Sequence, residues 1–149
     1  MRVLIQRVAK ASVEINKTEH NKISKGLLVF VGIEEKDNDV DMDYLCKKIL
    51  NLRIFDDSNG VMNDSVIDIE GEIMVISQFT LHASTRKGNR PSYIKAAKPD
   101  IAIPIYELFC KKLHAESGIE IKTGVFGADM KVSLINDGPV TIWIDSKDK

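Results

Sequence analysis

The sequence has few cysteines, few aromatic residues and no long apolar run. Cys46 and Cys110 are its only cysteines, and without CxxC spacing they predict neither a disulfide framework nor a metal site. No apolar stretch approaches the length that crosses a bilayer, and residues 1–7 lack the apolar core of a signal peptide. We therefore expect a cytoplasmic protein with reduced cysteines, no bound metal and no cofactor.

A strong net charge is also absent. The 149 residues include 21 basic and 22 acidic side chains, so no global basic field points to nucleic acid. Any contact with a polyanion must therefore be local. A hydrophobic content of 44% and a charged content of 29% are typical of a soluble globular domain. We expect one domain over residues 1–149, with 146–149 as a frayed tail.

Hydrophobic periodicity predicts both helices and strands. Apolar residues at helical spacing predict one helix through residues 42–50 and a second that Asp100 caps and Gly118 ends. Pro104 suits the second helix only if it lies within about the first turn. Strands are predicted from short β-prone runs at 2–8, 12–15, 26–33, 53–55, 65–69, 73–81, 119–122, 130–134 and 140–144.

Three connections between these strands shape the expected topology. The polar residues 16–22 indicate a turn, and Glu70-Gly71 would join 65–69 to 73–81 as a β-hairpin. Residues 136–139 would join the last two strands. The mixed order of strands and helices predicts an α+β domain, with mostly antiparallel sheets forming a partly closed β-barrel and two main helices.

Residues 73–81 hold polar side chains where a buried strand should continue. Ile73 to Ile76 are apolar, but Ser77, Gln78 and Thr80 follow them directly. A hydroxyl or amide that is buried without a partner costs a few kcal/mol, so such groups either bond within the fold or face a polar ligand. A strand whose hydroxyls satisfy neighbouring backbone also explains the run.

The segment 84–99 concentrates positive charge directly after this stretch. It contains no acidic residue and five basic ones, which are Arg86, Lys87, Arg90, Lys95 and Lys98. A solvated loop accounts for this composition. Binding of phosphate groups also accounts for it, and explains why the basic residues gather here.

Familiar catalytic motifs are missing. The sequence has no HExxH, GxSxG, Walker or strand-linked GxGxxG motif, and nothing in it supports a Ser-His-Asp triad. A regular strand would turn Ser77 and Phe79 to one face and Gln78 and Thr80 to the other. Either the strand bulges there, or its free N–H groups act on the substrate, as in an oxyanion hole.

Residues 136–141 read Asn-Asp-Gly-Pro-Val-Thr, which is more than a turn requires. A tight hairpin alone explains the glycine-proline pair. Together with Ser77-Gln78-Phe79-Thr80-Leu81, however, this stretch resembles the two signature motifs of the D-aminoacyl-tRNA deacylases, at the right separation in a chain of the right length. Further stretches similar to that family are 5–8, 11–13, 26–29, 53–55, 88–92, 123–130 and 132–134.

The resemblance implies a cytosolic homodimer with active sites at the subunit interface. It would hydrolyse the ester between a D-amino acid, or glycine mischarged on tRNA(Ala), and the terminal adenosine of a tRNA. In the family a cis glycine-proline pair, here Gly138 and Pro139, enters the partner's site and excludes L side chains. Arg7 would fix the orientation of that pair, and Met130 would belong to the same selectivity set. Exclusion suits the task, since enantiomers offer the same groups for attraction.

The resemblance also implies that Ser77, Gln78, Phe79 and Thr80 carry the catalysis. Thr80 as nucleophile would need a base within hydrogen-bond reach, and the motif offers none. We therefore favour substrate-assisted hydrolysis, in which the terminal 2′-hydroxyl of the tRNA helps and the N–H groups of Phe79 and Thr80 hold the oxyanion. Two other classes of protein fit the sequence less well. They are a non-catalytic RNA-binding module and a dimerisation domain with a satisfied polar strand.

Overall fold

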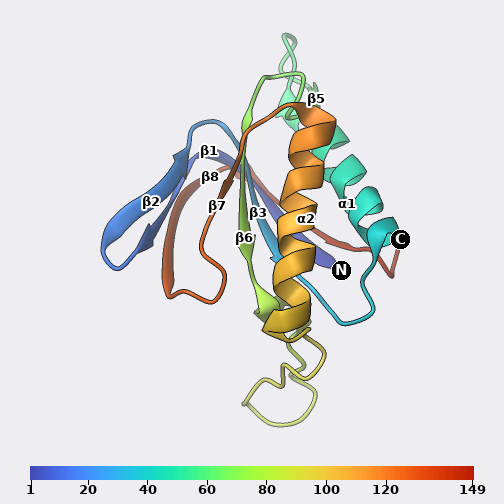
Figure 1. Cartoon of the computed structure of the whole chain (residues 1–149). Helices are drawn as coiled ribbons and strands as arrows, with labels where there is room; N and C mark the ends of the chain where they lie inside the picture. Colours follow the sequence, from blue (N-terminus) through green and yellow to red (C-terminus); the bar gives the residue numbers. More distant parts are fainter.

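A long N-terminal strand organises the sheet in the computed structural model, which describes residues 1–149 (Figure 1). This strand, β1 (Arg2–Ile15), pairs antiparallel with three others, β2 (Thr18–Ile23), β3 (Gly26–Gly32) and β8 (Met130–Asp145). On the far side of β3 the sheet continues in parallel through β6 (Glu72–Ser77) and β7 (Ile121–Thr123). The short strands β4 (Phe55–Asp56) and β5 (Met62–Asp64) form a separate ribbon. The α+β class with a partly closed, barrel-like sheet is confirmed.

Two helices lie on the same side of the sheet (Figure 1). They are α1 (Asp39–Asn51), which connects β3 to β6, and α2 (Pro99–Ser117), which connects β6 to β7. Such crossovers are what parallel neighbours require. Asn38 caps α1, because its side-chain oxygen accepts a bond from the Val40 N–H at 2.9 Å. Neither helix combines the length and the apolar character that crossing a bilayer requires.

Apolar side chains cover both faces of the sheet. Along β3, Leu27, Val29 and Val31 face the helices and join a cluster of 21 buried residues, whereas Leu28 belongs to a second cluster of 7 on the opposite face. The predicted apolar stripe of α1 is confirmed, since Met42, Leu45, Cys46, Ile49 and Leu50 are all buried in the first cluster. The smaller cluster is thin, and the first half of β8 packs against its edge.

The strand β8 changes face halfway along its length. Val132 and Leu134 pack on the smaller cluster, but Val140 and Ile142 pack on the helix side. In a regular strand all four residues would share one face, because their residue numbers are even. A shift by an odd number of residues must therefore lie between Leu134 and Val140. The pairing with β1 shows this shift. Gln6 faces Thr141 and Val8 faces Asn136, so a step of two residues along β1 corresponds to a step of five residues along β8. The extra residues form a bulge at which the sheet turns its corner.

Several predicted strand boundaries are wrong, because the prediction divided long strands into shorter ones. Residues 2–15 form one strand, and 18–23 pair with it, so only Asn16 and Lys17 remain in the turn. The chain does not reverse at 136–139. Both halves of β8 run antiparallel to the same strand, so 130–134 and 140–144 belong to one element rather than to a hairpin. In the predicted strand 53–55, only Phe55 is paired.

The predicted hairpin of 65–69 with 73–81 is also wrong. Residues 65–69 form a turn, in which the Asp68 carboxylate accepts bonds from the N–H and hydroxyl of Ser65 at 2.8 and 2.6 Å. The strand β6 is internal to the sheet as expected, but its neighbours β3 and β7 are parallel to it. An apolar run with β-branched residues suits parallel and antiparallel neighbours equally, so the composition could not decide between them.

Details at the second helix and at the C-terminus also differ. Helix α2 begins at Pro99 with Lys98 at its N-cap, so Asp100 is not the cap and Pro104 lies inside the helix. Gly118 ends it in the left-handed conformation, as predicted. The expected frayed tail is held at its start, because Ser146 is buried and the Lys147 ammonium pairs with the Asp41 carboxylate at 2.6 Å.

Candidate active site

The polar stretch after Ile76 leaves the strand and forms a tight turn. Strand β6 ends at Ser77, the Gln78 N–H donates to the Val31 carbonyl at 2.7 Å, and Phe79–His82 form a 3₁₀ helix, η1. The expected strand to residue 81 is therefore wrong. Within the turn the Gln78 side-chain amide lies 2.5 Å from the Thr80 hydroxyl. The Gln78 and Thr80 side chains, which a strand would also direct to one face, are in contact at the start of η1.

The first backbone amides of η1 are free to bind a ligand. Leu81 N–H donates to the Gln78 carbonyl at 3.1 Å and Ala83 N–H to the Thr80 carbonyl at 3.0 Å. The N–H groups of Phe79 and Thr80 donate no bond among those of the turns, loops and caps. The first donors of a helix lack partners inside it. The turn therefore presents two adjacent N–H donors beside the Gln78–Thr80 pair.

No base reaches the Thr80 hydroxyl. Its only hydrogen bond is with the Gln78 amide, which donates and cannot take up a proton. His82 is the nearest histidine, but it is 1% exposed and neither ring nitrogen has a partner. Burial lowers its pKa, which favours the neutral ring, and no hydrogen bond joins it to Thr80. The turn supplies hydrogen-bond donors rather than an activated nucleophile.

The glycine-proline pair protrudes from the bulge of β8. Gly138 and Pro139 are exposed, and the peptide bond between them is cis. Arg7, which is buried, holds the start of the pair, because its Nε donates to the Asp137 carbonyl at 3.0 Å and its Nη1 to the Ile54 carbonyl at 2.6 Å. Gly138 has a φ of 120°, and a Cβ there would lie 2.7 Å from the Arg7 Nη2. Only glycine fits this position without displacing the guanidinium.

The structure does not bring this pair to the polar turn of the same chain. The order of strands is β6, β3, β1 and then β8, so the two motifs lie on strands that are not neighbours. Ser77 ends β6 opposite Val31, whereas Arg7 lies at the level of Leu27, near the other end of β3. Met130 opens β8 and packs against the smaller cluster, which includes Ile76. Within one chain, the glycine-proline pair and Arg7 lie apart from residues 77–80, whereas Met130 packs on the cluster that includes Ile76, the residue before Ser77.

The basic segment lies at the same end as the polar turn. Ser84 and Ser92 close it through paired backbone bonds of 2.8 and 2.9 Å, and it extends as a long loop beyond the end of β6, at the bottom of Figure 1. All five basic side chains are exposed and none forms an ion pair, which leaves their charge available. The five are Arg86, Lys87, Arg90, Lys95 and Lys98.

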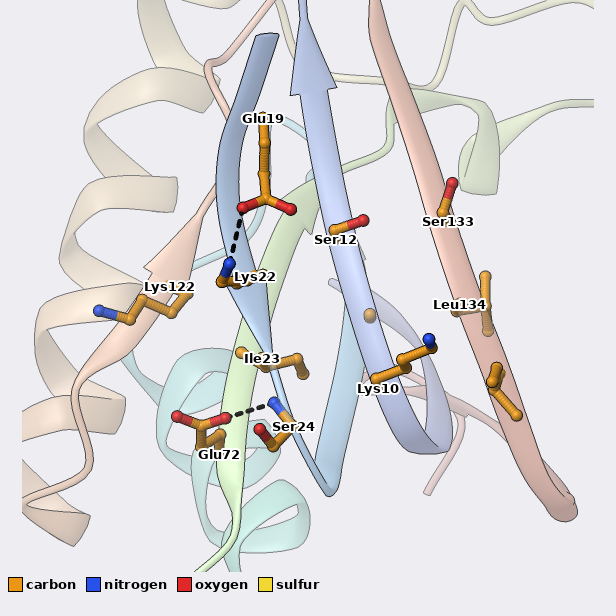
Figure 2. Close-up of a pocket in the computed structure, with 12 residues that line it drawn as sticks. Lys10, Ser12, Glu19, Lys22, Ile23, Ser24, Glu72, Lys122, Ser133 and Leu134 are labelled. Carbon is orange, nitrogen blue, oxygen red and sulfur yellow. Dashed lines mark hydrogen bonds and ion pairs between the residues drawn. The ribbon is translucent and has the colours of Figure 1, made fainter.

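A broad hollow of about 850 Å³ lies elsewhere, among β2, β1 and β8 (Figure 2). It holds none of the residues predicted for the site, and it touches β6 at Glu72, the end opposite to Ser77. Its charges are partly neutralised, because the Lys22 ammonium pairs with Glu19 at 3.1 Å and Glu72 accepts a bond from the Ser24 N–H. No local pattern pointed to this hollow, since its residues come from five strands and the loop after β2.

Solved structures with this architecture define the class of the domain. One, described as a c-Myc DNA unwinding element binding protein, matches 97% of this chain and 98% of its own, with a TM-score of 0.93 and 39% identity. Another, a probable eukaryotic D-amino acid tRNA deacylase, covers 96% and 97% with a TM-score of 0.82 and 16% identity, which shows the fold alone. The chain is thus a barrel-like α+β domain of the type found in tRNA deacylases.

Sequence comparison names the family. The family model for D-Tyr-tRNA(Tyr) deacylase matches residues 4–145. A D-aminoacyl-tRNA deacylase of Bacteroides fragilis (strain YCH46) is 67% identical over 149 residues, which are 100% of this chain and 99% of the relative. The one of Flavobacterium psychrophilum is 64% identical over the same shares of both chains. The chain belongs to the D-Tyr-tRNA(Tyr) deacylase family, and the predicted resemblance is confirmed.

Proposed function

We propose that this protein hydrolyses the ester between a D-amino acid and the terminal adenosine of a tRNA, releasing both. Glycine mischarged on tRNA(Ala) is a substrate of the same kind, because it too lacks an L side chain. The observation that carries the proposal is the turn after β6, in which two unpaired N–H donors adjoin the Gln78–Thr80 pair. Membership of a deacylase family over residues 4–145 supports it.

The amides of Phe79 and Thr80 bind the developing oxyanion of the ester carbonyl. Fixed donors of this kind are worth about 10²- to 10³-fold in rate each, since they need no reorganisation during the reaction. Gln78 orients the Thr80 hydroxyl through their 2.5 Å bond, and Ser77 lines the same end of β6. The 2′-hydroxyl of the substrate helps to activate the attacking water, because the turn has no group that could accept a proton from that water.

Chiral selection comes from Gly138 and Pro139 of a second copy of the chain. In one chain the pair is too far along the sheet to reach Thr80, yet it is exposed and anchored by Arg7, as an element that acts on another subunit should be. The backbone of the pair admits a hydrogen and refuses an L side chain. Met130, which packs on the smaller cluster with Ile76, belongs to the same selectivity set.

A homodimer also accounts for the outer edge of β8. This strand has 16 residues but pairs only with β1, and long unpaired edges are usually covered. Its side chains Ile135 and Trp143 are 52% and 48% exposed. We therefore propose a dimer with its active sites at the interface, acting in the cytoplasm, where aminoacyl-tRNA occurs.

The five exposed cations of residues 84–98 bind acceptor-stem phosphates. Their charges are unpaired, and phosphate contacts position a nucleic acid without reading its sequence. Many tRNAs are therefore substrates. The contacts weaken as salt rises, because bound counterions are released when the complex forms.

One assay tests the proposed function. Purified protein is mixed with D-tyrosyl-tRNA and, separately, with L-tyrosyl-tRNA, and the released amino acid is measured. We expect rapid release of D-tyrosine and little release of L-tyrosine. Binding of both tRNAs without hydrolysis would instead indicate an RNA-binding module, and the absence of any tRNA binding would indicate a dimerisation domain.

A further inference from the structure

One arginine that lies outside the polar turn donates a hydrogen bond into it. The guanidinium of Arg2, the first residue of β1, donates from Nη1 to the Leu81 carbonyl of η1 at 3.1 Å. Its Nε donates to the Asp145 carboxylate at 2.7 Å, and the two side chains are only 27% and 15% exposed. Because β8 holds one edge of this planar group, the other edge is fixed in its direction toward η1.

A glycine of β3 makes room for the same turn. The backbone of Gly32 is not left-handed, so its conformation does not require glycine. A Cβ there would instead lie 3.0 Å from the Leu81 Cβ and the His82 ring, and 3.1 Å from the Gln78 carbonyl oxygen. Therefore η1 packs directly on the backbone of β3, closer than a side chain at position 32 would allow.

Arg2 and Gly32 are neighbours across two paired strands. Arg2 pairs with Gly32 on one side and with Asp145 on the other, so a single row across β3, β1 and β8 contains all three. No local pattern links this row to the motif of residues 77–81, because its members are far apart in the sequence.

We propose that Arg2 and Gly32 are positioning residues for the oxyanion donors. Gly32 sets how closely η1 approaches β3, and Arg2 holds the end of η1 through the Leu81 carbonyl. The inference rests on the proposed function, which puts the ester carbonyl at the N–H groups of Phe79 and Thr80. Such donors act only while they are held in the geometry of the transition state, and a displacement of about 1 Å can cost about 10²-fold in rate.

A purely structural role for the two residues makes a different prediction. Loss of a structural contact would lower the stability of the whole domain and leave the turnover of each folded molecule unchanged. A positioning role lowers kcat at saturating substrate and leaves KM nearly unchanged, because the groups that bind the substrate are untouched.

Steady-state hydrolysis of D-tyrosyl-tRNA by the whole protein separates these two roles. Arg2→Met should lower kcat roughly tenfold, as loss of a hydrogen bond from a charged group predicts. Gly32→Ala should lower kcat by at least as much, because the added methyl group displaces η1. In both variants KM should stay within about twofold of the wild-type value.

Two matched controls make the same chemical changes away from η1. Arg53→Met removes a guanidinium whose Nη1 donates to the exposed Asn63 side chain at 3.2 Å. Gly71→Ala adds a Cβ that would also lie 3.0 Å from its neighbours, which are the side chains of Val66 and Ile69. Both controls should keep the wild-type kcat.

Amide hydrogen exchange at the turn provides a readout that does not depend on cleavage. The N–H groups of Leu81 and Ala83 are bonded within η1, whereas that of Gln78 is bonded to β3. In Arg2→Met and Gly32→Ala we expect exchange at the two η1 amides to quicken several-fold, and exchange at Gln78 to stay as it was.

The two measurements distinguish failure of this inference from failure of the proposed function. If the wild-type protein cleaves D-tyrosyl-tRNA, an unchanged kcat in Arg2→Met and Gly32→Ala overturns the inference. If it cleaves nothing, the proposed function fails, and unchanged exchange at η1 overturns the positioning of the turn as well. Asp145→Asn weakens the contact that holds Arg2, so it should lower kcat a few-fold and tests the same bond if Arg2→Met does not fold.

Discussion

The side-chain amide nitrogen of Gln78 lies 2.5 Å from the hydroxyl oxygen of Thr80. The amide is a donor, so the hydroxyl is held as an acceptor, which is the wrong role for a nucleophile about to lose its proton. A continued strand would also direct the two side chains to one face, but it would place the amides of Phe79 and Thr80 within the ladder, so the 3₁₀ turn is what leaves these donors free.

Replacing the hydroxyl should therefore cost little. We expect Thr80→Ala to retain D-tyrosyl-tRNA deacylation within about tenfold, whereas loss of a true nucleophile costs on the order of 10⁶-fold in kcat in a serine protease. Single-turnover rates measure the effect, with Thr85→Ala in the exposed loop as a control of the same chemical change. Abolished hydrolysis with intact fold and tRNA binding would restore Thr80 as the nucleophile.

Gly138 should tolerate no side chain. Gly138→Ala introduces a Cβ at 2.7 Å from the Arg7 Nη2 and at a φ of 120°, so it should shift the glycine-proline pair and lower the D-specific rate by roughly 10²-fold. Gly60→Ala is the matched control, because Gly60 also has a positive φ, of 75°, but no atom lies within 4 Å of its Cβ position. That variant should lose only about 1 kcal/mol in urea unfolding. Equal deacylation rates in the two variants would contradict the role of the pair.

The basic loop should govern affinity and not stereochemistry. Replacing Arg86 and Lys87 by Ser should weaken tRNA binding and reduce the slope of log K against log salt by roughly 1 to 2. The D over L preference should not change, since these side chains contact phosphates. Replacing Lys47 and Lys48 on α1 by Ser alters the net charge equally and should leave binding as it was. Unchanged affinity in the loop variant would refute the assignment of the loop.

Stability should fall in mild acid because of His82. Its pKa in the folded chain is lowered by burial, helped by the nearby Arg2 charge, while the unfolded chain titrates near the ordinary value of 6.5. Below that pH the unfolded state binds more protons, so the free energy of unfolding decreases as pH falls. His82→Met should flatten this part of the urea-unfolding profile, whereas His20→Met, at an exposed position, should not. A profile unaffected by His82→Met would contradict the buried neutral ring.

Local patterns predicted what local forces decide. The stripe of Met42, Leu45 and Ile49 predicted α1 because a helix buries one face, and Gly118 predicted the end of α2 because glycine adopts the left-handed conformation readily. The first motif was found because polar side chains follow an apolar run at Ser77, and the second because of the glycine-proline pair at residues 138–139. The family resemblance then linked them, which no periodicity could have done.

Long-range pairing was the part that escaped prediction. Whether Ile73 to Ile76 pair in parallel depends on the crossover helices, and residues 136–139 read as a reversal although β1 spans both halves of β8. The polar strand β2 has little apolar character, and its pairing with β1 comes from the hairpin at Asn16 and Lys17. The bond from Arg2 to the Leu81 carbonyl joins residues 79 positions apart, which side-chain spacing does not encode.

The distance between the turn after β6 and the bulge of β8 has a genetic consequence. If each catalytic centre takes the turn after β6 from one subunit and the glycine-proline pair from the other, a chain with a defective turn and a chain with a defective pair can complement each other. Co-expressing a chain whose η1 turn is inactive with a chain altered at Gly138 would then restore one working centre in every dimer that contains both chains. The two alleles, each of which encodes an inactive enzyme when expressed alone, would therefore complement each other.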